Sequence, residues 1–71
     1  MIYENEIPVP AGVISQYNFI ATDLNGRVVA YTHRPTLRNG VWMTSGFWQH
    51  FATLNNPRQD IENSLVEIVK S

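Results

Sequence analysis

The sequence contains no cysteine, so neither a disulfide bond nor a thiolate metal site can stabilise its 71 residues. It also lacks an excess of charge of either sign, because five Lys and Arg against six Asp and Glu give a formal net charge of -1. This balance argues against a nucleic-acid binder that depends on phosphate contacts and against an acidic mimic of DNA. No apolar run approaches the ~20 residues of a membrane-spanning helix, and the acidic residues 1–6 are unlike a signal peptide. We therefore expect a protein of the cytoplasm.

Motifs for catalysis are also lacking. His33 and His50 are the only histidines, and neither stands in the Glu-x-x-His or His-x-Glu context of zinc and di-iron sites. The chain has no Gly-x-x-x-x-Gly-Lys phosphate loop and no Ser in a nucleophile elbow. Asp23 is the one carboxylate of the central region, and we assign it to a turn. We expect a protein that is not an enzyme and that uses no cofactor and no metal.

The remaining patterns predict a single α+β domain over residues 1–71. Pro8 and Pro10 disfavour a central strand near the N-terminus, since proline cannot donate to a strand ladder. The expected parts are an extended N-terminal arm (1–16), a small antiparallel β-meander of three to five strands with two hairpins (17–54) and one C-terminal α-helix (57–69).

The first hairpin joins two runs rich in β-branched and aromatic residues, 17–23 and 27–33. Its turn is either type I′, centred on Asn25-Gly26, or type I from Asp23 to Gly26, with Gly26 in a left-handed bulge. We favour the second turn, because it explains an Asp at the first position. It places Tyr17, Phe19, Ala21, Val29, Tyr31 and His33 on one face, and Asn18, Ile20, Thr22, Val28, Ala30, Thr32 and Arg34 on the other. The first turn would exchange the faces of the second strand.

The second hairpin is predicted over residues 36–44, because Asn39-Gly40 between apolar runs is a strong hairpin sequence. The following segment, 47–54, fits both a helix and a strand. Its spacing of Phe47, Phe51 and Leu54 is helical, whereas its aromatic content suits a strand. We favour a strand or extended edge.

The C-terminal helix is predicted from Asn56 as N-cap and Pro57 in the first turn, with Arg58 and Glu62 paired four residues apart. Its apolar stripe consists of Ile61, Leu65 and Ile68, widened by Val66 and Val69. The stripe either covers the sheet or packs against the helix of a partner. Because so small a domain seldom gains more than ~3–5 kcal/mol alone, we expect a homo-oligomer that associates through an edge strand or this stripe.

A binding site is predicted between Arg27 and His50, where arginines, aromatic rings and hydroxyls alternate. No Asp or Glu lies between Asp23 and Asp60, so this part of the chain is locally basic. Rings stack on nucleobases, Arg binds phosphate oxygens, and hydroxyls bond to a ribose. The candidate ligand-binding residues are Tyr31, His33, Arg34, Arg38, Trp42, Thr44 and Trp48. Trp42 and Trp48 are first of all suited to the core of so small a domain, and the ligand-binding interpretation stays open beside it.

The pattern over residues 17–48 also resembles small accessory proteins of tailed bacteriophages that redirect or disarm the host. It reads Tyr17-x-Phe19-x-Ala21-x-Asp23-x-Asn25-Gly26-x-Val28-x-Ala30-Tyr31-x-x-x-Pro35-x-Leu37, followed by Trp42. One group of such proteins consists of sponges that sequester cyclic oligonucleotide signals of anti-phage (CBASS) defence. The resemblance implies a non-catalytic binder of a nucleotide-like signal in the host cytoplasm, and it carries over no site residues. The alternative is an inhibitor that docks on a host protein through a sheet edge or the helix.

Overall fold

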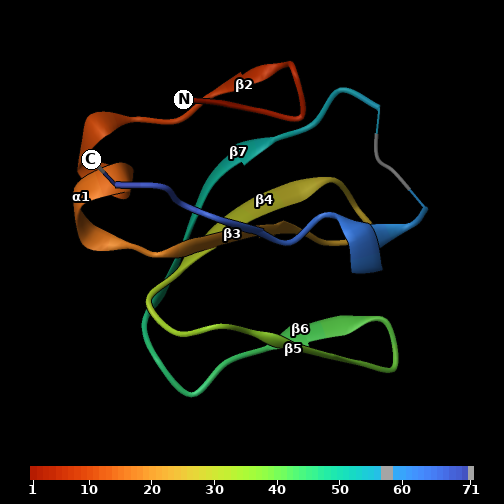
Figure 1. The fold of residues 1–71 in the computed structure, drawn as a ribbon. Helices are drawn as coiled ribbons and strands as arrows, with labels where there is room; N and C mark the ends of the chain where they lie inside the picture. Colours follow the sequence, from red (N-terminus) through yellow and green to blue (C-terminus); the bar gives the residue numbers. More distant parts are fainter. Residues whose placement is uncertain (57–58, 71) are drawn as a thin grey trace.

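Strands dominate the computed structural model, which describes residues 1–56 and 59–70 (Figure 1). Among these residues there are eight strands, one α-helix and one 3-10 helix. In chain order they are β1 (Ile2–Tyr3), β2 (Ile7–Pro8), α1 (Ala11–Gln16), β3 (Phe19–Thr22), β4 (Arg27–Tyr31), β5 (Thr36–Arg38), β6 (Val41–Met43), β7 (Trp48–Thr53), η1 (Ile61–Asn63) and β8 (Val66–Glu67).

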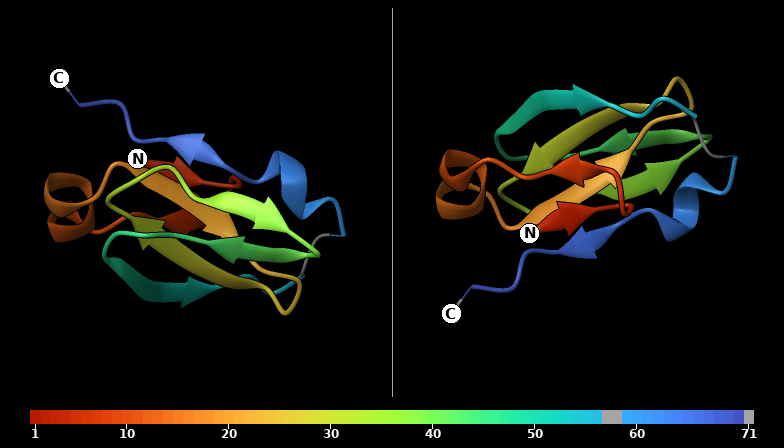
Figure 2. Two further views of the ribbon diagram at one scale, coloured as in Figure 1. Left: turned by 90° about the horizontal axis from the view of Figure 1, so that it is seen from below. Right: turned by 90° about the horizontal axis from the view of Figure 1, so that it is seen from above.

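The centre of the fold is an antiparallel sheet in the order β7-β4-β3-β8. The β1–β2 hairpin and α1 lie on one side of this sheet, and the β5–β6 hairpin lies on the other (Figure 1). The two views in Figure 2 confirm the layering, since β5–β6 stands in front of the sheet from below and β1–β2 from above. We call the side of β1–β2 the closed face and the side of β5–β6 the open face.

The central strand β4 is apolar on both faces, as a strand covered from two sides should be. Val28, Val29, Ala30 and Tyr31 are all buried. The closed-face core consists of Tyr3, Val9, Val13, Ile20, Val28, Ala30, Leu54 and Ile68. The open-face core is smaller and consists of Ala21, Val29 and Tyr31, with Phe19, Trp42 and Leu65 packed against it.

The turn between β3 and β4 is the type I turn from Asp23 to Gly26, which is the favoured one of the two predicted turns. The N–H of Gly26 donates to the carbonyl of Asp23 at 2.9 Å, and the N–H of Asp23 donates to the carbonyl of Arg27 at 2.9 Å. Gly26 has φ +87°, which glycine adopts without strain. Phe19 therefore pairs with Tyr31 and Ala21 with Val29, so the predicted register is confirmed.

The second hairpin and the strand after it are also confirmed. Leu37 pairs with Trp42 across β5 and β6, and Asn39 and Gly40 between the strands have φ of 53° and 77°, as a type I′ turn requires. Residues 48–53 form β7, which pairs with β4 at an edge of the sheet. Its register shifts between Val28 and Val29 of β4.

The predicted fold class, α+β with a small antiparallel β-meander of three to five strands and one C-terminal helix, is wrong. The described residues form eight strands in three sheets, with β5 and β6 in a two-stranded sheet of their own. In place of the helix the chain has η1 and β8, and β8 pairs with the outer edge of β3. Leu65 packs on the open face whereas Val66 packs on the closed face, an alternation that an extended chain provides and a helix does not. Pro57 and Arg58, the expected first turn and half of the expected ion pair, lie outside the described residues.

Pairing with β3 overrides the helical periodicity, because it satisfies polar backbone groups that the sheet edge would leave open. The N–H of Ile68 donates to the carbonyl of Asn18 at 2.8 Å. Ser64 is buried, and its hydroxyl donates to the carbonyl of Ile61 at 2.6 Å and accepts from the N–H of Thr22 at 3.0 Å. These bonds fix the segment before β8 against the sheet.

The expectation of an extended arm over residues 1–16 is also corrected, since this segment forms β1, β2 and α1. The α-helix begins after Pro10 and supplies Val13 to the closed-face core. Within the described part of the chain, no helix has the length and apolar character needed to cross a membrane.

Candidate functional site

A cleft opens on the face of the sheet that the β5–β6 hairpin covers only in part. Trp42 anchors the hairpin over β3, because its indole Nε1–H donates to the carbonyl of Thr22 at 3.0 Å and its ring packs on the open-face core. The part of β4 and β7 beside the hairpin stays uncovered, and a cleft of about 370 Å³ lies there. Its lining consists of Asp23, Arg27, Val29, Tyr31, Val41, Trp42, Met43, Thr44 and Trp48.

Three aromatic side chains from three strands line this cleft. Tyr31 belongs to β4, Trp42 to β6 and Trp48 to β7. Trp48 pairs with Tyr31 across the strands and is 57% exposed, which leaves most of its ring open to a ligand. The volume and the apolar, aromatic lining suit a small-molecule site.

The polar groups of the cleft gather around Asp23 and Arg27. These residues stand opposite each other at the turn end of β3 and β4, on the same face as Ala21 and Val29. The structure shows no hydrogen bond or ion pair from any described residue to the carboxylate of Asp23 or to the guanidinium of Arg27. Both groups are therefore available to a ligand.

The hydroxyl of Tyr31 is a third such group. The residue is 4% exposed, yet no described residue makes a hydrogen bond with its hydroxyl, which faces the cleft. Burial, and then the negative charge of Asp23, raise the pKa of Tyr31 to about 12. The hydroxyl therefore keeps its proton at neutral pH and can donate it.

A shallower groove adjoins the cleft. It has a volume of about 340 Å³ and is lined by Arg34, Thr36, Arg38, Met43, Thr44 and Ser45. Met43 and Thr44 also line the cleft, so the two depressions share a wall. Arg34 lies 5.6 Å from the centroid of the Phe19 ring, a cation–π distance that holds it near the sheet. Arg38 is exposed.

The predicted site residues divide between these two depressions. Tyr31, Trp42, Thr44 and Trp48 line the cleft, and Arg34, Arg38 and again Thr44 line the groove. His33 lines neither, because its ring Nδ1 stands 3.0 Å from the hydroxyl of Thr32, beyond the end of β4. Trp42 packs on the open-face core and also lines the cleft.

Sequence reasoning missed Asp23 and Arg27. Asp23 was assigned to the turn, but Asn25 provides the side-chain bond there: its Oδ1 accepts from the N–H of Arg27 at 3.1 Å. The favoured register already placed Asp23 and Arg27 opposite each other on the face of Tyr31. That shared face was the signal that could have found them.

Among the described residues, no three His, Asp or Glu side chains stand together as metal ligands. Comparisons of the chain with protein-family models, with curated proteins and with solved structures gave no match.

Proposed function

We propose that this protein binds a nucleotide-like anion without catalysis, with the base in the aromatic cleft and the phosphate in the groove. The observation that carries the proposal is the shared wall of Met43 and Thr44 between a ring-lined cleft and a groove that holds Arg34 and Arg38. Stacking on aromatic rings is tolerant of base identity, and arginine is well suited to phosphate oxygens. The ligand would cross the wall at Thr44, whose hydroxyl can bond to the sugar.

The biological role we propose is that of an anti-defence sponge, which sequesters a cyclic oligonucleotide immune signal in a bacterial host. The resemblance of residues 17–48 to small phage accessory proteins supports this role, and the cleft supplies a site of fitting size and chemistry. A sponge needs only binding, which agrees with a site made of rings, hydroxyls and arginines.

Calorimetric titration with cyclic di-GMP and cyclic di-AMP tests the proposal. We expect saturable binding and a melting temperature that rises with ligand excess. Arg38→Ala should weaken binding by about 1.5–3 kcal/mol, the value of a hydrogen bond to a charged group, without affecting the fold, since Arg38 is exposed. Lys70→Ala is the matched control, because it removes an exposed cation outside both depressions.

The proposal fails if neither dinucleotide binds, or if Arg38→Ala and Trp48→Ala both retain full affinity. Arg34→Ala is a further variant whose result needs a stability measurement beside it. Its guanidinium also lies over Phe19, so part of the loss would come from that contact.

A second candidate function, docking on a host protein, is favoured by the free edge of β7. Trp48 is 57% exposed on this edge strand, and Phe47 just before it is 80% exposed. An extended segment of a partner could add a strand there, or a second copy of this chain could pair with it. A pull-down from bacterial lysate that yields one stoichiometric protein, with no response to nucleotides, would favour this function. Light scattering tests self-association, and a mass of 8.1 kDa at micromolar concentration would exclude a homo-oligomer.

A further inference from the structure

We propose that the cleft selects guanine over adenine, with the Asp23 carboxylate binding the Watson–Crick edge of the base. This inference rests on the proposed function, because it assumes that the base enters the cleft. The observation behind it is the set of unpartnered polar groups in an otherwise aromatic cleft: the Asp23 carboxylate, the Arg27 guanidinium and the Tyr31 hydroxyl. Tyr31 as a residue is 4% exposed, but no fully buried side-chain N or O atom of the described residues lacks a partner, so its unpartnered hydroxyl is accessible from the cleft.

The charges in the cleft and in the groove determine which part of the nucleotide enters each of them. A phosphate would be repelled by the Asp23 carboxylate and attracted by Arg34 and Arg38 in the groove. Asp23 lies at the turn end of β3, where Gly40, in the turn before β6, and Val41, the first residue of β6, line a depression together with it. The uncharged base is therefore the part of the ligand that meets Asp23.

Hydrogen-bond complementarity then selects the base. A carboxylate only accepts hydrogen bonds, and it matches two adjacent donors. Guanine offers two such donors, N1–H and the 2-amino group, and beside them the O6 acceptor that Arg27 or the Tyr31 hydroxyl can donate to. Adenine offers the 6-amino donor next to the N1 acceptor, so one carboxylate oxygen would face a lone pair. A site with polar groups that the wrong base leaves unpaired discriminates strongly.

An aromatic cleft with a carboxylate could also suit an organic cation, because cations bind over ring faces. Arg27 argues against this occupant, since its guanidinium stands in the same cleft on the strand opposite Asp23. A guanine edge uses the carboxylate and the guanidinium together, whereas a cation would be repelled by the latter.

The experiment compares GMP, IMP, AMP and XMP by calorimetry on the full chain and on Asp23→Asn. We expect GMP to bind at least about ten-fold more tightly than AMP, with IMP between them because it lacks the 2-amino donor. In Asp23→Asn the carboxylate becomes an amide that both donates and accepts. GMP should lose about ten-fold or more, while XMP, with a carbonyl in place of the 2-amino group, should gain.

Asn25→Ala is the matched control in the same turn, because it removes the bond to the N–H of Arg27 and leaves the cleft lining unchanged. It should lower stability without altering the order of the four nucleotides. Tyr31→Phe is a second test of the polar set and should reduce the preference for GMP while the fold persists.

Four results are distinguishable. A GMP preference that Asp23→Asn reverses toward XMP supports the inference. Equal binding of GMP and AMP, still dependent on Arg38 and Trp48, overturns guanine selection and leaves the proposed function standing. If none of the four mononucleotides and neither cyclic dinucleotide binds, both guanine selection and the proposed function are overturned. Tight binding of tetramethylammonium at the cleft would show that the cleft accepts an organic cation and not a base, and would also overturn the inference.

Discussion

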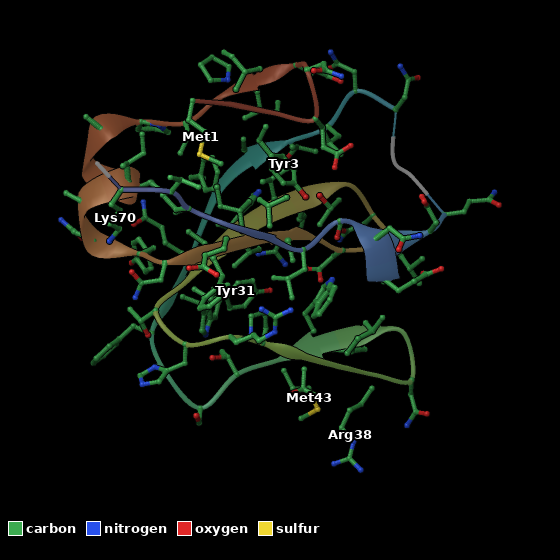
Figure 3. The ribbon with its side chains drawn as sticks, viewed as in Figure 1. Met1, Tyr3, Tyr31, Arg38, Met43 and Lys70 are labelled. Atoms are coloured by element: carbon green, nitrogen blue, oxygen red, sulfur yellow. The ribbon has the colours of Figure 1, made fainter. Side chains whose placement is uncertain are left out.

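The two most deeply buried tyrosines of this protein lie on opposite sides of the central sheet and are used differently (Figure 3). Tyr3, on the closed face, is 2% exposed, and its hydroxyl lies 2.6 Å from the hydroxyl of Thr22 and donates to the carbonyl of Ser64 at 2.8 Å. Tyr31, on the open face, is 4% exposed, and no described residue bonds to its hydroxyl.

The difference separates a structural polar group from one that is available to a ligand. On the closed face, Tyr3, Thr22 and Ser64 satisfy one another and join the N-terminal hairpin, β3 and the segment before β8. On the open face, Tyr31, Asp23 and Arg27 are held in place by the sheet but find no partner in the described chain. Asp23 and Arg27 are half-buried, and no fully buried side-chain N or O atom of the described residues lacks a partner, so the three groups open into the cleft, where a ligand can reach them.

The largest effect is expected from Trp42→Ala, which tests whether the open face also contributes to folding. The substitution removes the indole bond to Thr22 and the packing that anchors the hairpin over β3. We expect a loss of about 3 kcal/mol in the free energy of unfolding, measured with urea. Trp48→Ala, at a more exposed ring, should cost less than about 1 kcal/mol. Equal losses would show that the hairpin is not anchored as described.

The next largest effect on the free energy of unfolding is expected when each buried tyrosine is replaced by phenylalanine. Tyr3→Phe deprives Thr22 and Ser64 of a partner in a buried place, so we expect a loss of about 1–3 kcal/mol. Tyr31→Phe removes a hydroxyl with no partner and should stay within about 0.5 kcal/mol of the wild type. Chemical denaturation of both variants measures the contrast. A similar loss at the two positions would contradict the distinction between the faces.

A smaller effect is expected in alkaline solution. The pKa of Tyr31 is raised from 10.0 to about 12, so the folded state favours the neutral phenol. The associated stability is fully present below pH 10 and is lost as the pH rises from 10 to 12. Urea unfolding at steps across this range should show a decline that is smaller in Tyr31→Phe. An identical decline in the two proteins would assign it to other groups.

Local turn chemistry explains why part of this fold could be predicted from the sequence. The first hairpin depends on Asp23 and Gly26, and the second on Asn39 and Gly40, so each is encoded within a few residues. The C-terminal segment has no such local determinant. Its apolar spacing fits a helix, but its partner is β3, more than forty positions earlier in the chain, so the deciding contacts lie beyond the segment itself.

The candidate site, like the fold, could be predicted from the sequence only in part. Six of the seven predicted site residues line the cleft or the groove, because they lie in one stretch of the chain, around Tyr31, Arg38 and Trp48. His33 was included for its chemistry, but the strand ends before it. Asp23 begins the turn, as predicted, but the side-chain bond within the turn comes from Asn25, so the carboxylate of Asp23 is left to line the cleft. Whether a polar side chain has a hydrogen-bond partner depends on all residues that lie near it in the folded chain. The local sequence does not show which residues these are.

The most direct test of the open cleft is an NMR titration of the two indole N–H groups. The chain has only two tryptophans, so a ¹H–¹⁵N spectrum contains two indole signals, which Trp48→Phe assigns. Trp42 and Trp48 both line the cleft, and we therefore predict that both signals shift together and saturate as cyclic di-GMP is added. If both indole signals stay unchanged at millimolar dinucleotide, the open face is not a nucleotide site.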